Sequence, residues 1–443
     1  MHPVIQRILD DLITLNEGQP EFHQAATEVL SSLGPVVEQT PALADETLLR
    51  RMVEPERHIE FRVPWIDDQG NERVNRGWRV QFSSALGPYK GGLRFHPTVT
   101  AGTVRFLAFE QMFKNALTNQ RIGAGKGGAN INPKTMSVGE LQRFCQSFML
   151  ELSRHIGPNT DVPAGDIGVG SREIGWLFGQ YKRVRNAWDA GTITGKDLSS
   201  GGAQIRTEAT GYGLVMYANE MLGSEDWTDR VVSVSGSGNV AIYAIKLAQQ
   251  QGAKVITFSD SSGVVVDEQG VDLELLQQIK EVERGRVADY VERRPGAKLL
   301  TDASVWTVPT DIALPCATQN ELHADDAKTL VDNGVKLVAE GANMPSTNEA
   351  IEVFLDSNTP FGPGKAANAG GVAVSALEMA QNAARDYWTF EESQARLRNI
   401  MKNIHTSGME AAETYGMPGN LVAGSNIAGY LRVAEAMRHQ GSV

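Results

Sequence analysis

Three lysines in one short stretch of the chain are the residues with the clearest chemical potential. Lys90 lies in Gly-Pro-Tyr-Lys-Gly-Gly, Lys114 in Glu-Gln-Met-Phe-Lys-Asn, and Lys126 in Gly-Ala-Gly-Lys-Gly-Gly. Flanking glycines let a ligand approach the main chain, and a desolvated ammonium binds a carboxylate more strongly than an ammonium at the surface. Because the whole chain carries a net charge of −12 at pH 7, this local concentration of positive charge indicates a pocket for a small acid.

Lys126 is the best candidate for a reactive lysine, and Lys90 and Lys114 are candidate clamps for carboxylates. Burial and positive neighbours would both lower the pKa of Lys126, and a lysine that titrates nearer neutrality acts as a base or activates water. The alternative for Lys126 is a phosphate-binding loop, but residues 123–128 lack the spacing of a P-loop. A single lysine would be interpreted as a solvated surface residue; three grouped lysines favour a site.

Asp166 and Ser375 are the candidate partners of these lysines. Asp166 lies in a glycine-rich segment, residues 161–170, which we expect to be a loop. Its carboxylate is a candidate for proton transfer, although an aspartate beside glycine more commonly stabilises a turn or caps a helix. Ser375 follows the pair Gly370-Gly371, and its hydroxyl either donates to an anion or serves the first turn of a helix.

A dinucleotide-binding signature lies further along the chain. Residues 231–235 are predicted to be a strand, followed by Gly-Ser-Gly-Asn-Val-Ala and a helix. The first glycine permits the tight turn, and the second lets the backbone approach a pyrophosphate at the helix N-terminus. The strand-turn-helix setting favours a binding site over a turn that binds nothing. The candidate cofactor contacts here are Gly236, Ser237, Gly238, Asn239 and Val240.

The choice between NAD and NADP is less clear from the residues alone. Asp260 ends the next predicted strand, where an acidic residue usually bonds the ribose 2′-hydroxyl of NAD. Serines that can donate hydrogen bonds to a phosphate surround it, and Lys280 and Arg286 in a following segment either reach the same place or are solvated charges on a helix. The serines are Ser259, Ser261 and Ser262.

The elements that must position these residues fall into two groups. In the N-terminal half, strands are predicted at residues 59–65 and 77–82 with a turn at 67–70, and helices at 100–118 and 138–155. From the glycine pair at 201–202 onward, strands and helices alternate, which indicates a parallel, doubly wound sheet.

We therefore predict an α/β fold with two domains separated by a cleft. Residues 201–370 form a Rossmann-type dinucleotide-binding domain between the two glycine pairs, and residues 1–200 plus 371–443 form a substrate-binding and oligomerisation domain. The length of 443 residues fits two or three cores. We expect the N-terminal residues to form an amphipathic helix that packs on its own domain or at a subunit interface.

The composition excludes several classes of function. The net negative charge disfavours nucleic-acid and anionic-membrane binding. Two cysteines argue against a disulfide framework and for a cytoplasmic protein. No cysteine–histidine cluster predicts a metal site, and neither a signal peptide nor a membrane-spanning segment is expected.

These motifs together resemble the bacterial-type hexameric glutamate dehydrogenases of the NADP-specific kind, within the Glu/Leu/Phe/Val dehydrogenases. The resemblance covers nearly the whole chain and implies NADP as cofactor, with NAD as the alternative, and L-glutamate, 2-oxoglutarate and ammonium as substrates of a homohexamer. Glu283 departs from the pattern, where a positive residue is expected. The matching segments are residues 87–97, 110–115, 125–128, 161–170, 207–213, 339–345 and 365–372.

The resemblance also implies a role for individual residues. Lys126 is then the catalytic lysine and Asp166 the proton-transfer carboxylate. Lys90 and Ser375 hold the side-chain carboxylate of glutamate. The remaining assignments are Lys114 with Gln111 and the Gly165 main chain for the α-carboxylate, Thr210 and Asn239 for the nicotinamide cofactor, and Asn343 for its ribose.

Two rival functions remain at this point. A dehydrogenase of an apolar amino acid such as leucine would share the architecture but lack the cation and hydroxyl of Lys90 and Ser375. A cofactor-sensing or scaffolding protein would bind the dinucleotide without catalysis.

Overall fold

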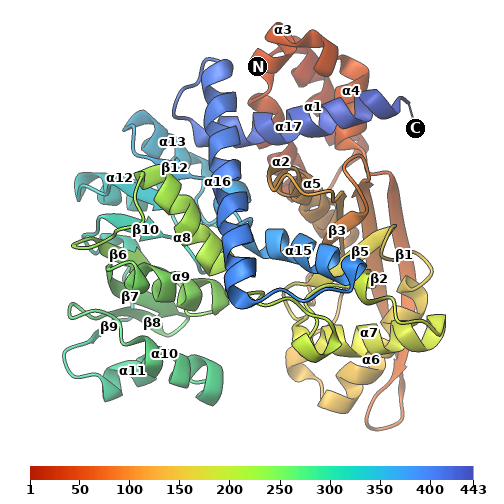
Figure 1. Ribbon diagram of the computed structural model, residues 1–443, viewed down its shortest axis with the longest axis horizontal. Helices are drawn as coiled ribbons and strands as arrows, with labels where there is room; N and C mark the ends of the chain where they lie inside the picture. Colours follow the sequence, from red (N-terminus) through yellow and green to blue (C-terminus); the bar gives the residue numbers. More distant parts are fainter. Residues whose placement is uncertain (443) are drawn as a thin grey trace. The chain divides into compact units, whose positions relative to one another are not determined.

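The computed structural model describes residues 1–442, which form two compact units (Figure 1). The first unit comprises residues 1–206, 372–394 and those from 426 onward, and the second comprises 207–371 and 395–425. Both units are α/β, as predicted. Within residues 1–442 no helix is long and apolar enough to cross a bilayer.

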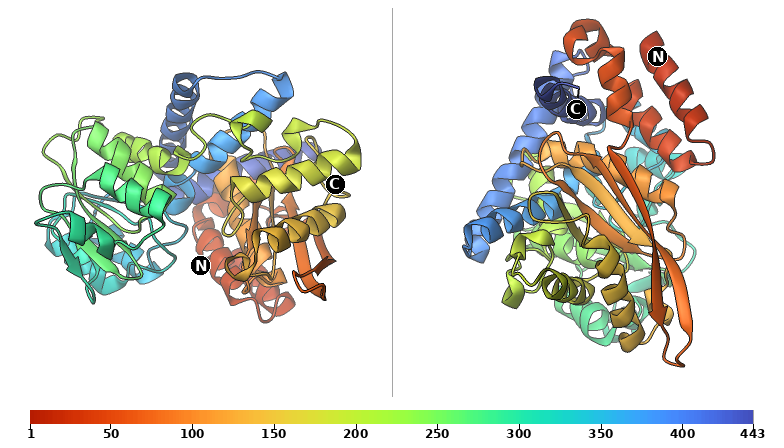
Figure 2. Two further views of the ribbon diagram at one scale, coloured as in Figure 1. Left: turned by 90° about the horizontal axis from the view of Figure 1, so that it is seen from below. Right: turned by 90° about the vertical axis from the view of Figure 1, so that its right-hand side faces the viewer.

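The first unit is built on a five-stranded sheet with the order β1-β2-β4-β3-β5. β1 pairs antiparallel with β2 and β2 with β4, whereas β3 runs parallel to both β4 and β5. β1 and β2 form a long hairpin (Figure 2). The strands are β1 (Arg57–Ile66), β2 (Glu72–Ser83), β3 (Tyr89–Phe95), β4 (Ala124–Ala129) and β5 (Asp161–Gly165).

The prediction of a loop over residues 161–170 is wrong for its first half. Asp161–Gly165 is β5, which lies at the edge of the sheet and pairs with β3 through Lys90 and Val162. The segment contains a proline and ends in a glycine, so its local pattern does not indicate a strand. An edge position tolerates that proline because no ladder hydrogen bond is needed from its nitrogen. Only the residues after Gly165 make the expected turn, in which Val169 N–H donates to Asp166 O at 2.9 Å.

Helices cover this sheet with apolar side chains. α5 (Ala101–Leu117) begins after the N-cap Thr100 and packs on β2, β4 and α2 (Pro20–Ser31). α6 (Val138–Leu152) ends earlier than predicted and packs with α7 (Ser171–Arg185). The large apolar side chains of α5 that are buried include Phe106, Phe109, Met112 and Phe113.

The N-terminal helix is amphipathic, as the sequence predicts. α1 (Pro3–Leu15) buries its apolar face and contacts α2 and α4 (Glu46–Val53) of the same unit, whereas Ile13 is 43% exposed. This arrangement matches the interpretation of a helix that packs on its own domain. Between α2 and α4 lies the short α3 (Gly34–Gln39).

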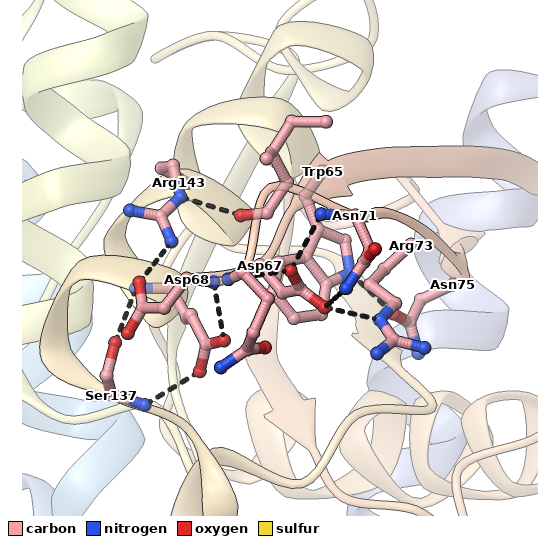
Figure 3. Close-up of polar contacts among 11 residues, drawn as sticks. Trp65, Asp67, Asp68, Asn71, Arg73, Asn75, Ser137 and Arg143 are labelled. Carbon is pink, nitrogen blue, oxygen red and sulfur yellow. Dashed lines mark hydrogen bonds and ion pairs between the residues drawn. The ribbon is translucent and has the colours of Figure 1, made fainter.

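The predicted turn between β1 and β2 is held by a buried carboxylate (Figure 3). Asp67 is 6% exposed and accepts hydrogen bonds from the Asn71 N–H at 2.8 Å and from Arg73 Nε at 2.9 Å. Arg143 of α6 binds the carboxylate of Asp68 at 2.6 Å. The tip of the hairpin is thus fixed by ionic contacts rather than by apolar packing.

The second unit contains a seven-stranded sheet with the order β12-β11-β10-β6-β7-β8-β9. The first five strands in this order are parallel, which confirms the predicted parallel sheet, and β8 and β9 add an antiparallel edge that the sequence did not reveal. The strands are β6 (Val231–Val234), β7 (Lys254–Asp260), β8 (Gly263–Val266), β9 (Lys298–Leu300), β10 (Ile312–Leu314), β11 (Leu337–Ala339) and β12 (Phe361–Gly362).

Two pairs of helices pack with this sheet. α8 (Ala209–Leu222) and α9 (Asn239–Gln250) contact each other and strands β6, β7, β11 and β12. α12 (Ala324–Asp332) and α13 (Asn348–Asp356) contact each other and share an apolar core with β10 and β11. The shorter elements are α10 (Leu273–Gln277), the π-helical η5 (Gln278–Glu283), α11 (Ala288–Arg293) and α14 (Gly364–Ala367).

The C-terminal helices are α15 (Gly370–Ala384), α16 (Phe390–Thr414) and α17 (Leu421–Gln440). Residues 395–425, which include most of α16, belong to the second unit by their contacts. The predicted division had assigned all of 371–443 to the first domain. Its boundary near residue 201 lies close to the observed change at 206–207.

Candidate active site

The site residues of the first unit are brought together by β3, β4 and β5. Lys90 lies on β3 opposite Val162, and Lys126 lies on β4. Gly165 ends β5 and Asp166 follows it directly. The strands can approach closely because a side chain at Gly91 would collide with the carbonyl oxygen of Gly125. A row of small residues therefore allows three strands to present their polar groups in one place.

Lys126 and Asp166, the candidates for a reactive lysine and its partner, form an ion pair. Lys126 Nζ lies 3.1 Å from Asp166 Oδ1, and Arg94 Nε of β3 lies 2.7 Å from Asp166 Oδ2. Burial opposes the ionisation of Asp166, but the two cations outweigh it and hold its pKa well below the usual range. Asp166 is therefore ionised, and each of its carboxylate oxygens accepts a hydrogen bond from one of these cations. Arg94 was not anticipated as its partner.

The ammonium groups of Lys126 and Lys114 lose their protons more easily than ordinary lysines. Burial lowers the pKa of Lys126, with Asp166 opposing and Arg94 adding to the effect. Burial and the nearby charge of Lys126 together lower the pKa of Lys114 to about 8. Both lysines thus titrate closer to neutrality than a lysine in water, as expected for groups that handle protons or bind anions.

Lys90 is buried among other charged groups. Its residue is 1% exposed, and burial lowers its pKa well below the ordinary value. Arg206 and Arg79 lower this pKa further, whereas Glu378 and Asp161 raise it. Arg206 Nε has no hydrogen-bond partner among the described residues. Buried cations in excess of nearby anions are arranged to receive a negatively charged group.

Ser375 meets a second hydroxyl that the sequence analysis missed. Its Oγ lies 3.1 Å from Thr194 Oγ1, and both residues are buried. Ser375 stands in the second turn of α15, so the alternative of a hydroxyl in the first turn of the helix does not describe it. A pair of hydroxyls can donate to two oxygens of one carboxylate.

Gln111 and a buried asparagine link α5 to the strands. Gln111 Nε2 donates to Asn115 Oδ1 at 2.6 Å. Asn115 Nδ2 in turn donates to the carbonyl oxygens of Lys90 at 3.0 Å and Gly123 at 2.6 Å. These bonds fix the helix that carries Lys114 against the strands that carry the other two lysines.

A fully buried ion pair lies beneath the site. Arg79 of β2 binds the carboxylate of Asp161 and donates to the carbonyl oxygen of Gly91 at 3.0 Å. Gln81 Nε2 donates to the same carboxylate at 3.0 Å. The pair therefore ties β2, β3 and β5 together with charge-assisted bonds.

The dinucleotide motif of the second unit has the predicted conformation. Gly236 adopts a φ of +81°, which favours glycine, and its N–H donates to Ser259 Oγ at 2.8 Å. Gly238 is the N-cap of α9, and no atom lies within 4 Å of where its side chain would stand. The turn thus leaves open space above a helix N-terminus, as a pyrophosphate requires.

Asp260 is already engaged by the protein on both carboxylate oxygens. Oδ1 accepts from the Ser262 N–H and hydroxyl at 2.8 and 2.6 Å, and Oδ2 accepts from Lys280 Nζ at 2.9 Å and Val287 N–H at 3.1 Å. Burial opposes its ionisation, but these donors lower its pKa to about 2. Its charge is therefore neutralised by Lys280.

Positive charge accumulates beside the serines that follow β7. Arg286 Nη1 donates to Ser261 Oγ at 2.8 Å, so Lys280 and Arg286 both reach the end of the strand. Glu283, which departs from the expected pattern, is paired with Arg293 at 2.7 Å. Because Glu283 pairs with Arg293, it does not neutralise Lys280 or Arg286.

Two family models match most of this chain. The model described as Glutamate/Leucine/Phenylalanine/Valine dehydrogenase matches residues 201–441, and the model of the Glu/Leu/Phe/Val dehydrogenase dimerisation domain matches residues 55–183. The chain belongs to the Glu/Leu/Phe/Val dehydrogenase family. The first model includes the turn at Gly236 and the second includes all three lysines of the first unit.

Within the Glu/Leu/Phe/Val dehydrogenases, the chain is similar over its full length to glutamate dehydrogenases. The chain is 52% identical to the NADP-specific glutamate dehydrogenase of Helicobacter pylori (strain J99) and 54% identical to that of Escherichia coli (strain K12), and each match covers 99% of both chains. Among solved structures it is similar to the Plasmodium falciparum glutamate dehydrogenase, with 48% identity, a TM-score of 0.96, and coverage of 99% of this chain and 95% of that one.

The residues missed by sequence reasoning in this dehydrogenase share one property. Arg94, Thr194 and Arg206 carry no motif of their own, and each acts beside residues far away in sequence. Arg94 stands four residues after Lys90 within the matching segment 87–97, so its closeness to that lysine was an available signal. Nothing local singles out Thr194 or Arg206.

The other predicted cofactor residues lie in the second unit. Thr210 is in the first turn of α8, and Asn343 follows β11, where its Oδ1 accepts from Asn368 Nδ2 at 2.9 Å. Ser237 lies between the two glycines of the turn, and Val240 is in the first turn of α9.

Proposed function

We propose that the protein catalyses the reversible, NADP-dependent oxidative deamination of L-glutamate to 2-oxoglutarate and ammonium. The observation that carries this proposal is that one unit holds buried cations at two positions, Lys90 and Lys114, in addition to the pair of Lys126 and Asp166. The proposed Lys90 position includes the Thr194–Ser375 hydroxyls. A substrate with two carboxylates uses both positions. The full-length similarity to NADP-specific glutamate dehydrogenases supports the same assignment.

The grouping around Lys90 decides against a dehydrogenase of an apolar amino acid. A leucine or phenylalanine side chain would leave a buried ammonium and two hydroxyls without a ligand, at a considerable cost in desolvation. The side-chain carboxylate of glutamate instead supplies acceptors for Lys90 and Ser375. We add Thr194 and Arg206 to this proposed pocket, since the first bonds Ser375 and the second lies near Lys90.

The α-carboxylate is assigned to Lys114, with Gln111 and the main chain of Gly165. The charges of Lys126 and Asp166 both act on the Lys114 ammonium, so these groups lie near one another. A substrate carboxylate bound to Lys114 therefore places the adjacent Cα near the catalytic pair. This arrangement fixes the substrate at both ends and orients the bond that breaks.

The proposed chemistry assigns separate proton-transfer roles to Lys126 and Asp166. Bound NADP⁺ supplies the acceptor for the hydride that leaves Cα, which converts the amine into an iminium. Lys126, in its uncharged form, accepts a proton from the water that attacks this iminium. Asp166, 3.1 Å from the Lys126 ammonium, relays that proton to the nitrogen of the carbinolamine. The proton of the carbinolamine hydroxyl then goes to the departing ammonia, so that ammonium leaves and the carbonyl of 2-oxoglutarate forms. In the reverse direction each proton moves the opposite way.

A pH dependence follows from the lowered pKa of Lys114. The protonated form binds the α-carboxylate, so affinity for a diacid should be constant below about pH 8 and fall by roughly tenfold per pH unit above it. Glutarate is a suitable probe because it remains a dianion over this range. We expect its inhibition constant against 2-oxoglutarate to rise above that pH, and in Lys114→Gln to be larger and to rise less steeply over the same range. A wild-type constant that stays level through this range would contradict the assignment.

NADP is assigned as the cofactor, with its 2′-phosphate held by Lys280, Arg286 and the serines near Asp260. Asp260 carries a charge that Lys280 already balances, and its oxygens are occupied by protein donors. It is therefore poorly placed to accept the 2′-hydroxyl of NAD. Remaining contacts are proposed for the second unit as in the sequence analysis: Thr210, Gly236, Ser237, Gly238, Asn239, Val240, Ser259, Ser261 and Asn343.

Removal of this basic pair should change the choice of cofactor. In Lys280→Met with Arg286→Met, we expect the KM for NADPH to rise by about a hundredfold, since two charge-assisted bonds are lost. The KM for NADH should change less than about threefold. Arg293→Met is the matched control, because Arg293 neutralises Glu283 in the same segment. Equal losses for both cofactors would argue against a 2′-phosphate site here.

Oligomerisation is indicated by the dimerisation-domain model that matches residues 55–183. We propose that the assembly is the homohexamer implied by the family resemblance. Size-exclusion chromatography with light scattering gives the mass directly. The cytoplasmic location remains a prediction from the cysteine count, and the substrate-binding and cofactor-binding roles of the two domains are proposals.

The function is tested by following NADPH absorbance. Oxidation of NADPH should require 2-oxoglutarate and ammonium together, and should stop when either is omitted. Formation of glutamate in equal amount, measured by chromatography, completes the test. Binding of NADPH without any turnover would instead support the rival function of a non-catalytic sensor.

A further inference from the structure

A fully buried ion pair joins two distant segments of the first unit. Lys196 Nζ lies 2.7 Å from Glu378 Oε1, and neither side chain is exposed to solvent. Lys196 lies in the loop between two 3-10 turns, Ala190–Thr192 and Leu198–Ser200, whereas Glu378 lies on α15. Lys196 also lies over the ring of Phe178, at 5.8 Å from its centroid. Burying two charges is costly unless further bonds satisfy them, so the remaining bonds of this pair are informative.

These remaining bonds all go to one short loop. Lys196 Nζ donates to the carbonyl oxygen of Ile193 at 2.5 Å, and Glu378 Oε2 accepts from the Gly195 N–H at 2.9 Å. Thr194 lies between these two anchored residues, and its N–H donates to Pro163 O of β5 at 3.0 Å. The pair therefore fixes the backbone on both sides of Thr194.

The pair also acts on α15. Glu378 lies one helical turn after Ser375, so the two side chains lie on neighbouring parts of one face. The Glu378 carboxylate binds the Gly195 N–H of the loop. It thereby fixes the distance between this loop and the helix that carries Ser375. The outcome is the 3.1 Å contact between Thr194 Oγ1 and Ser375 Oγ.

We propose that Lys196 and Glu378 are positioning residues that set the pocket for the substrate's side-chain carboxylate. They act through Thr194 and Ser375, and through the charge of Glu378 on Lys90 and Arg206. This inference rests on the proposed function, because it assigns the pocket to the diacid substrate. It predicts that the pair governs the preference for a second carboxylate, while the catalytic pair and the cofactor site are unaffected.

The alternative is a purely structural role, in which loss of the pair only reduces the amount of folded enzyme. The two roles differ in one observable ratio. A structural defect lowers turnover of every substrate equally, whereas a positioning defect spares a substrate without the second carboxylate. 2-Oxopentanoate is that substrate, since it has the chain length of 2-oxoglutarate but one carboxylate.

The experiment compares wild-type enzyme with Glu378→Gln, assayed with 2-oxoglutarate and with high concentrations of 2-oxopentanoate. We expect the KM for 2-oxoglutarate to rise about tenfold or more, while its kcat changes less than about threefold. The kcat/KM for 2-oxopentanoate should stay within about twofold, which lowers the diacid-to-monoacid ratio at least about fivefold.

A second variant guards against misfolding, because Glu378→Gln leaves a buried ammonium without its anion. Lys196→Met with Glu378→Met removes both charges at similar volume, and such apolar replacements are often tolerated. We expect it to show the same fall in the ratio. Asp67→Asn is the matched control, since Asp67 is also a buried carboxylate that accepts a backbone N–H and pairs with an arginine (Figure 3). Its ratio should equal that of the wild type.

An unchanged ratio in the folded variants would overturn the positioning role, even if their stability falls. A wild-type enzyme without activity on 2-oxoglutarate would instead overturn the proposed function itself. Thermal unfolding and NADPH binding, measured on each variant, establish that the enzyme is folded and that the cofactor site is intact.

Discussion

Replacing Lys126 with alanine is expected to lower kcat for the amination of 2-oxoglutarate by at least about a thousandfold, the scale of a lost general acid-base group. The ammonium of Lys126 lies 3.1 Å from Asp166, and burial lowers its pKa toward the range in which it can exchange a proton with water. Alanine removes this group and also leaves Asp166 with Arg94 as its remaining cation. Stopped-flow or steady-state NADPH oxidation measures the loss.

Binding of NADPH should survive this substitution, since the proposed cofactor contacts lie on the other unit. Fluorescence quenching by NADPH on titration gives the dissociation constant, which should remain within about threefold of the wild type. Lys134→Ala is the matched control, because Lys134 is exposed on the same unit and should keep full activity. Appreciable turnover in Lys126→Ala would remove this lysine from the mechanism.

Replacing Lys90 with leucine and Ser375 with valine should lower kcat/KM for 2-oxoglutarate by about a thousandfold or more, as for a buried charge left without its partner. The double variant removes the ammonium and one hydroxyl of the proposed side-chain pocket and substitutes apolar groups. A carboxylate that enters this pocket then loses its donors in a desolvated place. Activity with a monocarboxylate of apolar side chain should fall much less, or increase.

The same preparation should bind NADPH normally, which separates a defect of the substrate pocket from misfolding. Unchanged kinetics with 2-oxoglutarate in the folded double variant would refute the assignment of the side-chain carboxylate to Lys90 and Ser375. The carboxylate would then have to be bound elsewhere in the protein.

The sequence predicted those parts of the protein that local pattern determines. The helix carrying Lys114 follows from its apolar periodicity, and the turn at Gly236 follows from a strand, two spaced glycines and a helix. The three lysines were recognised because glycines or an aromatic helical face surround each of them. In each case the decisive neighbours lie within a few residues along the chain.

Features that depend on distant contacts were not predicted. β5 contains a proline and a glycine, and it is a strand because β3 and the carboxylate of Asp161 hold it in place. Thr194 meets Ser375, and the loop that carries Thr194 is bound by Lys196 and Glu378, which are far apart in sequence. A single sequence contains no local signal for such pairings.

Asp260 shows how spatial neighbours change the meaning of a motif. By its position after the second strand it favours NAD, yet the folded chain places Lys280 on one of its oxygens and Arg286 on the adjacent Ser261. The Asp260 carboxylate therefore binds the Lys280 ammonium instead of a ribose hydroxyl. The π-helical turn that carries Lys280 could not be foreseen from residue periodicity.

The central claim is that this enzyme selects a substrate with two carboxylates. A comparison of its catalytic efficiency with different keto acids tests this claim most directly. Initial rates of NADPH oxidation in the presence of ammonium are compared for 2-oxoglutarate, 4-methyl-2-oxopentanoate and phenylpyruvate. We predict a kcat/KM for 2-oxoglutarate at least about a thousandfold above the other two, because only this acid satisfies the buried donors at both ends. Equal or greater efficiency with either apolar keto acid would contradict the account.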